Sequence, residues 1–222
     1  MKSENLNTNK APFTKGGCPQ SGQRDFYKDI ENLSVSLCST STLKKGSNNR
    51  RTMKDSGISW IGAIPENWKI SKIKNHFNII AGSTPDSLNP LYWDGNIIWV
   101  TPADYKTSDK FISNGRKNIT KKGYNSCNTT IVPKGSIIFS KRAPIGSVAI
   151  ASNPLCTNQG CLSCVVKDKS NITYYYYIMA SFTNEFELLG SGTTFKEISA
   201  SDFGNFAIPF PPLAEQQAIA DF

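Results

Sequence analysis

Two stretches of sequence decide the expected fold: MKDSGISWIGAIPENW at residues 53–68 and PFPPLAEQQAIA at residues 209–220. In the first stretch, large apolar side chains alternate with two glycines and a proline, a pattern that disfavours regular helix. It favours a strap, a chain segment that aromatic anchors fix to a domain. In the second stretch, Pro212 precedes a turn that contains Glu215, which is the pattern of a helix start. We therefore expect a strap at residues 53–68 and a helix that begins near Pro212.

Length and composition indicate a globular protein. The 222 residues suffice for one large domain or two small ones, and 38% hydrophobic content with 11% aromatics suffices for a core. No apolar run approaches the roughly 18–20 residues of a membrane span, and the N-terminus lacks the apolar region of a signal peptide. We therefore expect a cytoplasmic protein without membrane contact, whose six cysteines are reduced thiols.

The net charge of +8 is unevenly distributed. Residues 1–52 carry nine Lys or Arg against four Asp or Glu, residues 106–142 carry nine against one, and residues 143–222 carry three against seven. A basic cluster binds a phosphate backbone by releasing its counterions, although an ordinary solvated surface is the alternative for charge alone. The cations of the middle stretch are Lys106, Lys110, Arg116, Lys117, Lys121, Lys122, Lys134, Lys141 and Arg142. Among them we expect Lys121 and Lys122 to contact DNA.

Residues 1–52 differ from the rest of the chain, because they are rich in Asn, Ser, Thr, Gly and Lys and contain only short apolar clusters. Such a composition buries too little apolar surface to fold, so we expect a disordered or non-native extension. Met53 is then a candidate for the true start of the protein. A basic arm that helps to bind DNA is the alternative.

The pattern from Trp68 onward predicts an α/β domain of the α+β type, with a curved, mixed or antiparallel sheet and flanking helices. Short β-rich runs bounded by Gly, Pro or Asn indicate the strands. These runs lie at residues 77–80, 97–100, 130–132, 136–140, 148–150, 161–166 and 206–208. One helix is expected from Asn171 to Leu189, where apolar residues recur at helical spacing, Asn171 or Thr173 can cap the start and Gly190 can end it.

Polar residues at two predicted turns are candidates for contact with bases. The sequence KRAPIG at residues 141–146 follows a strand, and Arg142 at such a tip, with Lys141 beside it, can bind guanine in bidentate fashion or clamp a phosphate. Asn158 and Gln159 carry amides that suit the adenine edge, although amides also satisfy turns and neighbouring backbone.

Catalytic motifs are interrupted or missing. NPLY at residues 89–92 is similar to the Asn-Pro-Pro-Tyr/Phe motif of adenine methyltransferases, but Leu91 breaks it, and no glycine-rich methyl-donor turn follows an early strand. Asp86 lacks the downstream Glu-x-Lys that a Mg²⁺-dependent nuclease needs. The single histidine, His76, excludes most His-based acid–base schemes. We therefore expect a protein that is not an enzyme and needs no cofactor.

The cysteines do not form a convincing zinc motif. Cys161 and Cys164 make one C-x-x-C pair, but a structural zinc site needs four ligands and no second paired spacing exists. We expect buried thiols on a core strand instead, because free cysteine behaves as a small hydrophobe.

In their order and spacing, the two stretches quoted first resemble a specificity (S) subunit of type I restriction-modification enzymes. Further similarities are GSTP at residues 82–85, which resembles the turn after the family's first strand, and KRAPIG, which resembles a basic S-R-R-G-x-x-G segment. The resemblance covers residues 53–222. It implies a target recognition domain at residues 53–210, which binds double-stranded DNA, and the start of a long spacer helix at residues 211–222.

The sequence GSGTTFKEI at residues 190–198 is glycine-rich but lacks the Gly-Lys-Ser/Thr ending of a nucleotide-binding P-loop, so ATP binding is not expected. It resembles the G-S-T-x-x-x-I loop of the same family. This resemblance implies that the backbone amides and the side chains of Thr193, Thr194 and Lys196 approach the DNA backbone.

The resemblance also implies partners, namely methyltransferase (M) subunits and a restriction/translocase (R) subunit. Full-length family members carry two recognition domains and two long helices that pair as an antiparallel coiled coil, where the methyltransferase subunits dock. This chain resembles one half of such a subunit, as a fragment, a remnant or a segment of a rearranging locus. Two other classes remain open: the recognition domain of a fused type II restriction enzyme-methyltransferase, and an interaction domain that does not touch DNA.

Overall fold

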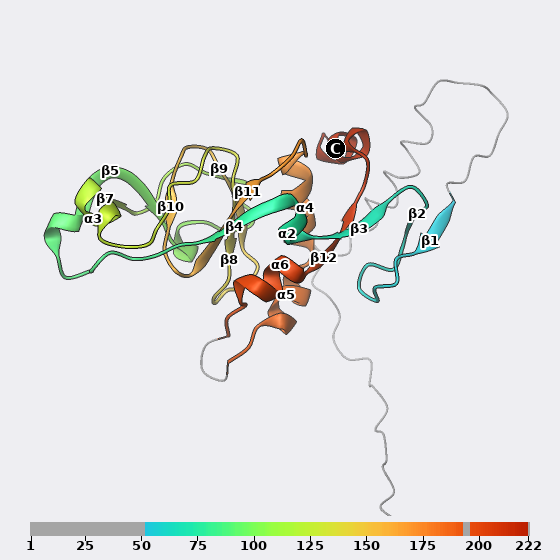
Figure 1. Ribbon diagram of the computed structural model, residues 1–222, viewed down its shortest axis with the longest axis horizontal. Coiled ribbons are helices and arrows are strands. Elements are labelled where there is room, and N and C mark those ends of the chain that lie inside the picture. The colour runs from blue at the N-terminus through green and yellow to red at the C-terminus, as the bar shows by residue number, and fades with distance from the viewer. Residues whose placement is uncertain (1–51, 193–195, 222) are drawn as a thin grey trace, which may run out of the picture.

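The computed structural model describes residues 52–192 and 196–221. These residues form an elongated molecule with a central sheet, a lobe at one end and the strap at the other (Figure 1). The extension expected at residues 1–52 lies, apart from Thr52, outside the described residues. None of the described helices is long and apolar enough to cross a membrane.

A five-stranded mixed sheet forms the centre of the molecule, with strand order β4-β11-β8-β9-β6. The first four strands are antiparallel to their neighbours, whereas β6 pairs in parallel with β9. In chain order the strands are β4 (Phe77–Ala81), β6 (Phe111–Ile112), β8 (Ile137–Ser140), β9 (Val148–Ala151) and β11 (Cys161–Val166). The expected mixed sheet with flanking helices is thus confirmed.

The central sheet is buried on both faces. Because successive side chains of a strand point to opposite faces, β8 places Ile137 and Phe139 in one core and Ile138 in another. The neighbouring strand β9 does the same with Val148 and Ala149. Nearly continuous apolar runs are the sequence pattern of such a two-sided sheet.

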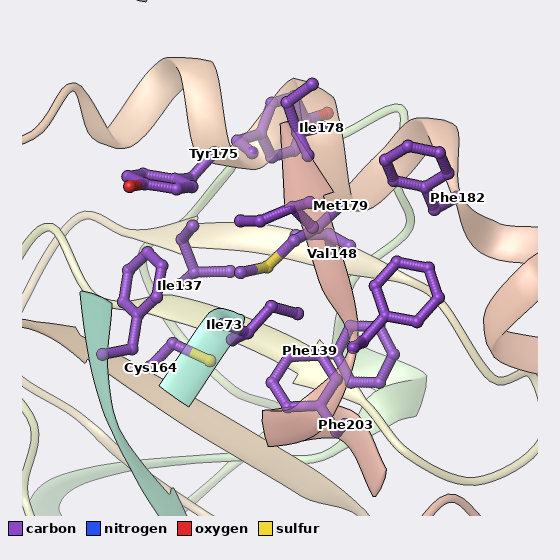
Figure 2. Packing of buried hydrophobic residues seen from close by; sticks show 14 of the residues in the cluster. Ile73, Ile137, Phe139, Val148, Cys164, Tyr175, Ile178, Met179, Phe182 and Phe203 are labelled. Carbon is purple, nitrogen blue, oxygen red and sulfur yellow. The ribbon is translucent and has the colours of Figure 1, made fainter. Parts of the chain in front are cut away.

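Helices cover one face of the sheet. Figure 2 shows Ile178, Met179 and Phe182 packed over the side chains of the sheet strands. The helices of this layer are α4 (Ile172–Ser181), α5 (Thr183–Leu189) and α6 (Ala200–Asn205). Ser199 caps α6 by accepting a hydrogen bond from the Asp202 amide at 3.0 Å.

The prediction of one continuous helix over residues 171–189 is wrong. The expected cap is confirmed, because the Asn171 side chain accepts a hydrogen bond from the Tyr174 amide at 3.1 Å. The chain leaves helical geometry at Phe182, with φ −97° and ψ 23°, and a second helix starts at Thr183. The Phe182 ring is buried at the break, 5.5 Å from the ring of Phe206. Apolar spacing does not reveal the break, because both helices pack on the same core.

A second, smaller sheet has a small core of its own and forms the distal lobe, which we define as η1, α3 and the strands β5, β7 and β10. The opposite face of the central sheet is covered by the end of β5 and by loop residues, namely Val100, Tyr105, Val132 and Leu155. The strand order of the smaller sheet is β10-β5-β7, and β10 pairs in parallel with β5. The elements are η1 (Pro90–Tyr92), β5 (Trp93–Val100), β7 (Lys117–Ile119), α3 (Lys121–Asn125) and β10 (Cys156–Thr157). A short helical turn, η2 (Pro102–Asp104), follows β5. The prediction of a strand at residues 130–132 is wrong, because only Val132 pairs there, in an isolated bridge with Leu155.

The strap contains a small hairpin, in which β1 (Met53–Asp55) pairs with β2 (Ala63–Pro65). It leads into β3 (Lys69–Lys72), which pairs with β12 (Ala207–Phe210), and into the short helix α2 (Ile73–His76). Trp60 stacks on Phe206 at 5.7 Å, and Trp68 is buried. The aromatic anchoring expected of the strap is therefore present.

The expected helix start near Pro212 is confirmed, because α7 (Leu213–Ala220) begins there. Polar contacts fix α7 to the strap and to α4. The Glu215 carboxylate accepts hydrogen bonds from the Trp68 indole at 2.6 Å and from Asn67 at 2.8 Å. Gln216 is buried, accepts from the Asn171 amide at 3.0 Å and donates to the Pro211 carbonyl at 3.0 Å.

Three of the four cysteines in the described residues lie in the core, on strands, as expected, whereas Cys127 is partly exposed. Cys156, Cys161 and Cys164 are all buried. Burial raises the pKa of Cys156 to about 11 and that of Cys161 to about 12, so both stay protonated at neutral pH. Within the described ranges, no group of three or more His, Cys, Asp or Glu is placed to hold a metal ion.

Replacing Gln216 with alanine should lower the free energy of unfolding by roughly 1–3 kcal/mol, because the Asn171 amide and the Pro211 carbonyl lose their partner. Gln217→Ala is the matched control on the same helix, since this exposed side chain contacts other exposed groups and should cost no more than about 0.5 kcal/mol. Urea unfolding measures both. Equal effects of the two variants would contradict a structural role for the buried amide.

Candidate DNA interface

Four polar segments meet at one edge of the central sheet. Strands β4 and β8 end at this edge and β9 and β11 begin there, because these neighbours are antiparallel. The fourth segment joins them through a bridge between Glu197 and Arg142. We call this surface the loop edge. It comprises residues 82–85, residues 141–147, residues 158–160 and a fourth segment, of which residues 190–192 and 196–198 are described.

The first and third segments fit closely together. The Ser83 amide donates to the Thr157 carbonyl at 2.9 Å, and the Thr84 hydroxyl donates to the side-chain oxygen of Gln159. A Cβ on Gly82 would lie 2.2 Å from the Asn158 carbonyl oxygen, so only glycine allows this approach. The GSTP turn therefore supports the segment that carries the two candidate amides.

Asn158 and Gln159 differ in whether their side-chain amides are already engaged in hydrogen bonds within the protein. The Asn158 side-chain oxygen accepts a hydrogen bond from the Gly160 amide at 2.9 Å, so it satisfies the turn. The backbone amide of Asn158 donates to the Val100 carbonyl at 2.9 Å, which ties the turn to β5. Gln159 is exposed and receives its hydrogen bond from Thr84. Its amide nitrogen has no protein partner among the described residues, and Gln159 is the better placed of the two to meet a base.

Lys141 and Arg142 lie side by side on one carboxylate. The Lys141 Nζ is 2.6 Å from Glu197 Oε1, and the Arg142 Nε is 2.7 Å from Glu197 Oε2. Partial burial opposes ionisation of Glu197, but the hydrogen bonds from the two cations outweigh this effect and lower its pKa. The carboxylate is therefore ionised at neutral pH, and the group carries two positive charges against one negative charge.

The remaining loop candidates lie partly outside the described residues. Thr193 and Thr194 lie outside the described residues. Lys196 is exposed and directly precedes Glu197 at the loop edge.

Lys121 and Lys122 lie on α3 in the distal lobe, apart from the loop edge (Figure 1). Thr120 caps α3, because its hydroxyl accepts from the Gly123 amide at 3.1 Å. Both lysines are exposed, and the Lys121 ammonium lies 4.9 Å from the centre of the Tyr124 ring. The candidate residues thus fall into two groups, one at the loop edge and one on the distal lobe.

Other cations of residues 106–142 have local partners. Lys110 donates to the Tyr177 hydroxyl at 3.3 Å, and Arg116 pairs with Asp104 at 2.8 Å. The basic stretch is therefore not one continuous cluster.

Sequence reasoning missed two residues at the loop edge, Thr84 and Glu197. The GSTP turn marked the position of Thr84, but only the fold shows its contact with Gln159. Glu197 gave no signal, because a lone carboxylate after a lysine is common on solvated surfaces.

A mixed sheet that gathers polar loops at one edge defines the chain as a candidate DNA-reading domain, and comparison with known proteins gives its family. The family model described as the type I restriction modification DNA specificity domain matches residues 65–222. Because this match covers most of the chain, the protein belongs to that family.

Individual relatives are similar over the same region. The type I restriction enzyme MjaIX specificity subunit of Methanocaldococcus jannaschii is 42% identical over 163 residues, which cover 72% of this chain and 38% of that protein. The HindI specificity subunit of Haemophilus influenzae is 26% identical over 151 residues, or 67% of this chain and 33% of that protein. The chain thus spans well under half the length of these relatives.

A solved structure shares the fold. The HsdS subunit from Thermoanaerobacter tengcongensis superposes with a TM-score of 0.57 at 18% sequence identity. The match covers 90% of this chain and 42% of that one. The shared fold includes the mixed α+β arrangement that positions the loop edge.

Gly82→Ala should lower the free energy of unfolding by roughly 1–3 kcal/mol, because the added methyl group forces the Asn158 carbonyl away. Ser83→Ala is the matched control on the same turn and should change stability by no more than about 0.5 kcal/mol. Thermal melting of both variants measures the difference. If Gly82→Ala is as stable as Ser83→Ala, the turn accommodates the added methyl group without loss of stability, and the prediction is wrong.

Proposed function

We propose that the chain is the DNA-reading half of a type I specificity subunit. In this proposal residues 53–210 form a target recognition domain, and residues 211–222 begin the spacer helix. The convergence of four sequence-distant polar segments at the loop edge carries the proposal, because base readout needs several side chains presented on a rigid support.

The two groups of candidate residues have different roles in the proposal. At the loop edge, Arg142 binds the guanine edge and Gln159 binds an adenine edge, while Asn158 shapes the turn. Lys141 and Lys196, with Thr193 and Thr194, contact phosphates. On the distal lobe, Lys121 and Lys122 contact the DNA backbone, which positions the duplex without reading its sequence.

The chain is non-catalytic in this proposal. It directs methyltransferase (M) subunits and the restriction/translocase (R) subunit to double-stranded DNA at a target site. Support comes from the relatives, which are named as specificity subunits of restriction enzymes. The fixed position of α7 against the strap gives the spacer helix a defined direction from the recognition domain.

Duplex binding should weaken steeply with salt, and Lys121→Gln should weaken binding to all duplexes alike, because a phosphate contact carries no sequence information. Fluorescence anisotropy at several salt concentrations measures this, and the slope of log K against log salt should fall by about one in magnitude. Lys72→Gln is the control, since this exposed lysine lies on β3 at the strap end. If Lys121→Gln and Lys72→Gln behave alike, the distal lobe does not contact DNA.

Arg142→Gln should cost roughly 1–3 kcal/mol of binding on the cognate duplex and relax discrimination at one base pair. The cognate sequence is first selected from a random duplex library with the wild-type chain. Titrations against cognate and scrambled duplexes then separate base reading from backbone contact. An equal loss on both duplexes would make Arg142 a phosphate ligand.

A further inference from the structure

Glu197 is the one carboxylate that contacts both cations of the 141–147 segment among the described residues. We propose that Glu197 is a positioning residue, which holds the Arg142 guanidinium in the orientation that reads a guanine. This inference rests on the proposed function of the loop edge and adds to it a residue that sets specificity.

The contact uses only one side of the Arg142 guanidinium. Arginine carries five N–H donors in a planar fork, one on Nε and four on the two terminal nitrogens. Nε donates to Glu197 Oε2 at 2.7 Å, and within the described residues the terminal nitrogens have no protein partner. A bidentate contact to guanine O6 and N7 needs two neighbouring donors. The terminal pair of Arg142 is therefore left for this contact.

The carboxylate itself is held firmly in place. Its other oxygen binds Lys141 Nζ at 2.6 Å. The Glu197 backbone pairs with Ser191, donating to the Ser191 carbonyl at 2.9 Å and accepting from the Ser191 amide at 3.0 Å. The next residue, Ile198, donates to the Lys141 carbonyl at 3.0 Å. Glu197 is thus fixed by backbone contacts on two sides before any DNA arrives.

The other end of Arg142 is also fixed. The buried Ser140 hydroxyl donates to the Arg142 carbonyl at 2.8 Å, and the Lys141 amide donates to the Gly160 carbonyl at 2.9 Å. An arginine held at its backbone and at Nε loses less side-chain entropy on binding than a free arginine does. This preorganisation favours recognition of a specific base over nonspecific electrostatic binding of DNA.

Charge distinguishes positioning from phosphate binding. A carboxylate at a DNA-facing surface repels phosphates, so Glu197 weakens any purely electrostatic grip of Lys141 and Arg142. If the segment served only to bind phosphate, Glu197 would be a disadvantage. As a positioning residue, Glu197 lowers the affinity for all DNA duplexes but increases the discrimination between the cognate base and other bases.

The test uses the full chain and the selected cognate duplex, in which each guanine is replaced singly by 7-deazaguanine, which lacks the N7 acceptor. Wild type should lose roughly tenfold in affinity at one guanine, because one charged hydrogen bond is removed. Arg142→Gln should show no such penalty. Glu197→Gln should reduce the penalty below about threefold and bind scrambled duplex at least as tightly as wild type does, because one negative charge is gone.

Glu187→Gln is the matched charge control, since this exposed carboxylate lies on α5, and it should keep the full penalty. Glu197→Asp is a second variant that keeps the negative charge but shortens the side chain by one methylene, so the carboxylate withdraws from Arg142 Nε. It should also reduce the penalty, while binding scrambled duplex no more tightly than wild type does, because the charge is unchanged. Circular dichroism melting checks that all variants are folded. Glu197→Asp decides the question if Glu197→Gln does not fold.

A full penalty in Glu197→Gln, or in Glu197→Asp, would overturn the positioning role while leaving DNA binding intact. If wild type shows salt-dependent binding but no penalty at any guanine, Arg142 reads no guanine N7 and the inference is wrong. If wild type binds no duplex at all, the proposed function itself is wrong.

Discussion

The burial of the central sheet on both faces is the constraint on which the rest of the structure depends. Strands β8 and β9 place apolar side chains alternately in two separate cores, so each face needs its own covering layer. Helices α4 to α6 supply one layer, and the end of β5 with the loop residues Tyr105, Val132 and Leu155 supplies the other. Polar loops are excluded from both faces, because unpaired polar groups are costly in a core. They gather at the edge where the strands turn, and this edge becomes the candidate interface.

The two ends of the described chain are joined by a small set of polar contacts. The Trp68 indole and the Asn67 amide donate to Glu215, while the Gln216 side chain accepts a hydrogen bond from the backbone amide of Asn171 at the start of α4. These contacts involve charged or buried groups, which makes them stronger than ordinary surface hydrogen bonds. They set the direction in which α7 leaves the domain. The two stretches that carry the family resemblance therefore act as one structural unit.

The loop edge combines a rigid support with a partly neutralised charge. Gly82 lets two turns approach closely, and the Thr84 contact with Gln159 joins them. Glu197 offsets one of the two charges of Lys141 and Arg142 and orders both side chains. The distal lobe carries Lys121 and Lys122 without such a counter-charge in the contacts described for them. The ordered cations of the loop edge suit base reading, whereas the lysines of the distal lobe suit contact with the DNA backbone.

The sequence by itself determined the features that depend on local pattern. Six of the seven expected strand runs, the Asn171 cap and the helix start at Pro212 follow from spacing, turn residues and capping chemistry, which act over a few neighbours. Tertiary structure alone decided the break at Phe182, the loss of the strand at residues 130–132 and the pairing of Arg142 with Glu197. The break coincides with a ring packed against Phe206, and the ion pair joins residues 55 positions apart. Such contacts arise only when a two-sided sheet brings distant loops to one edge, and no local pattern encodes that distance.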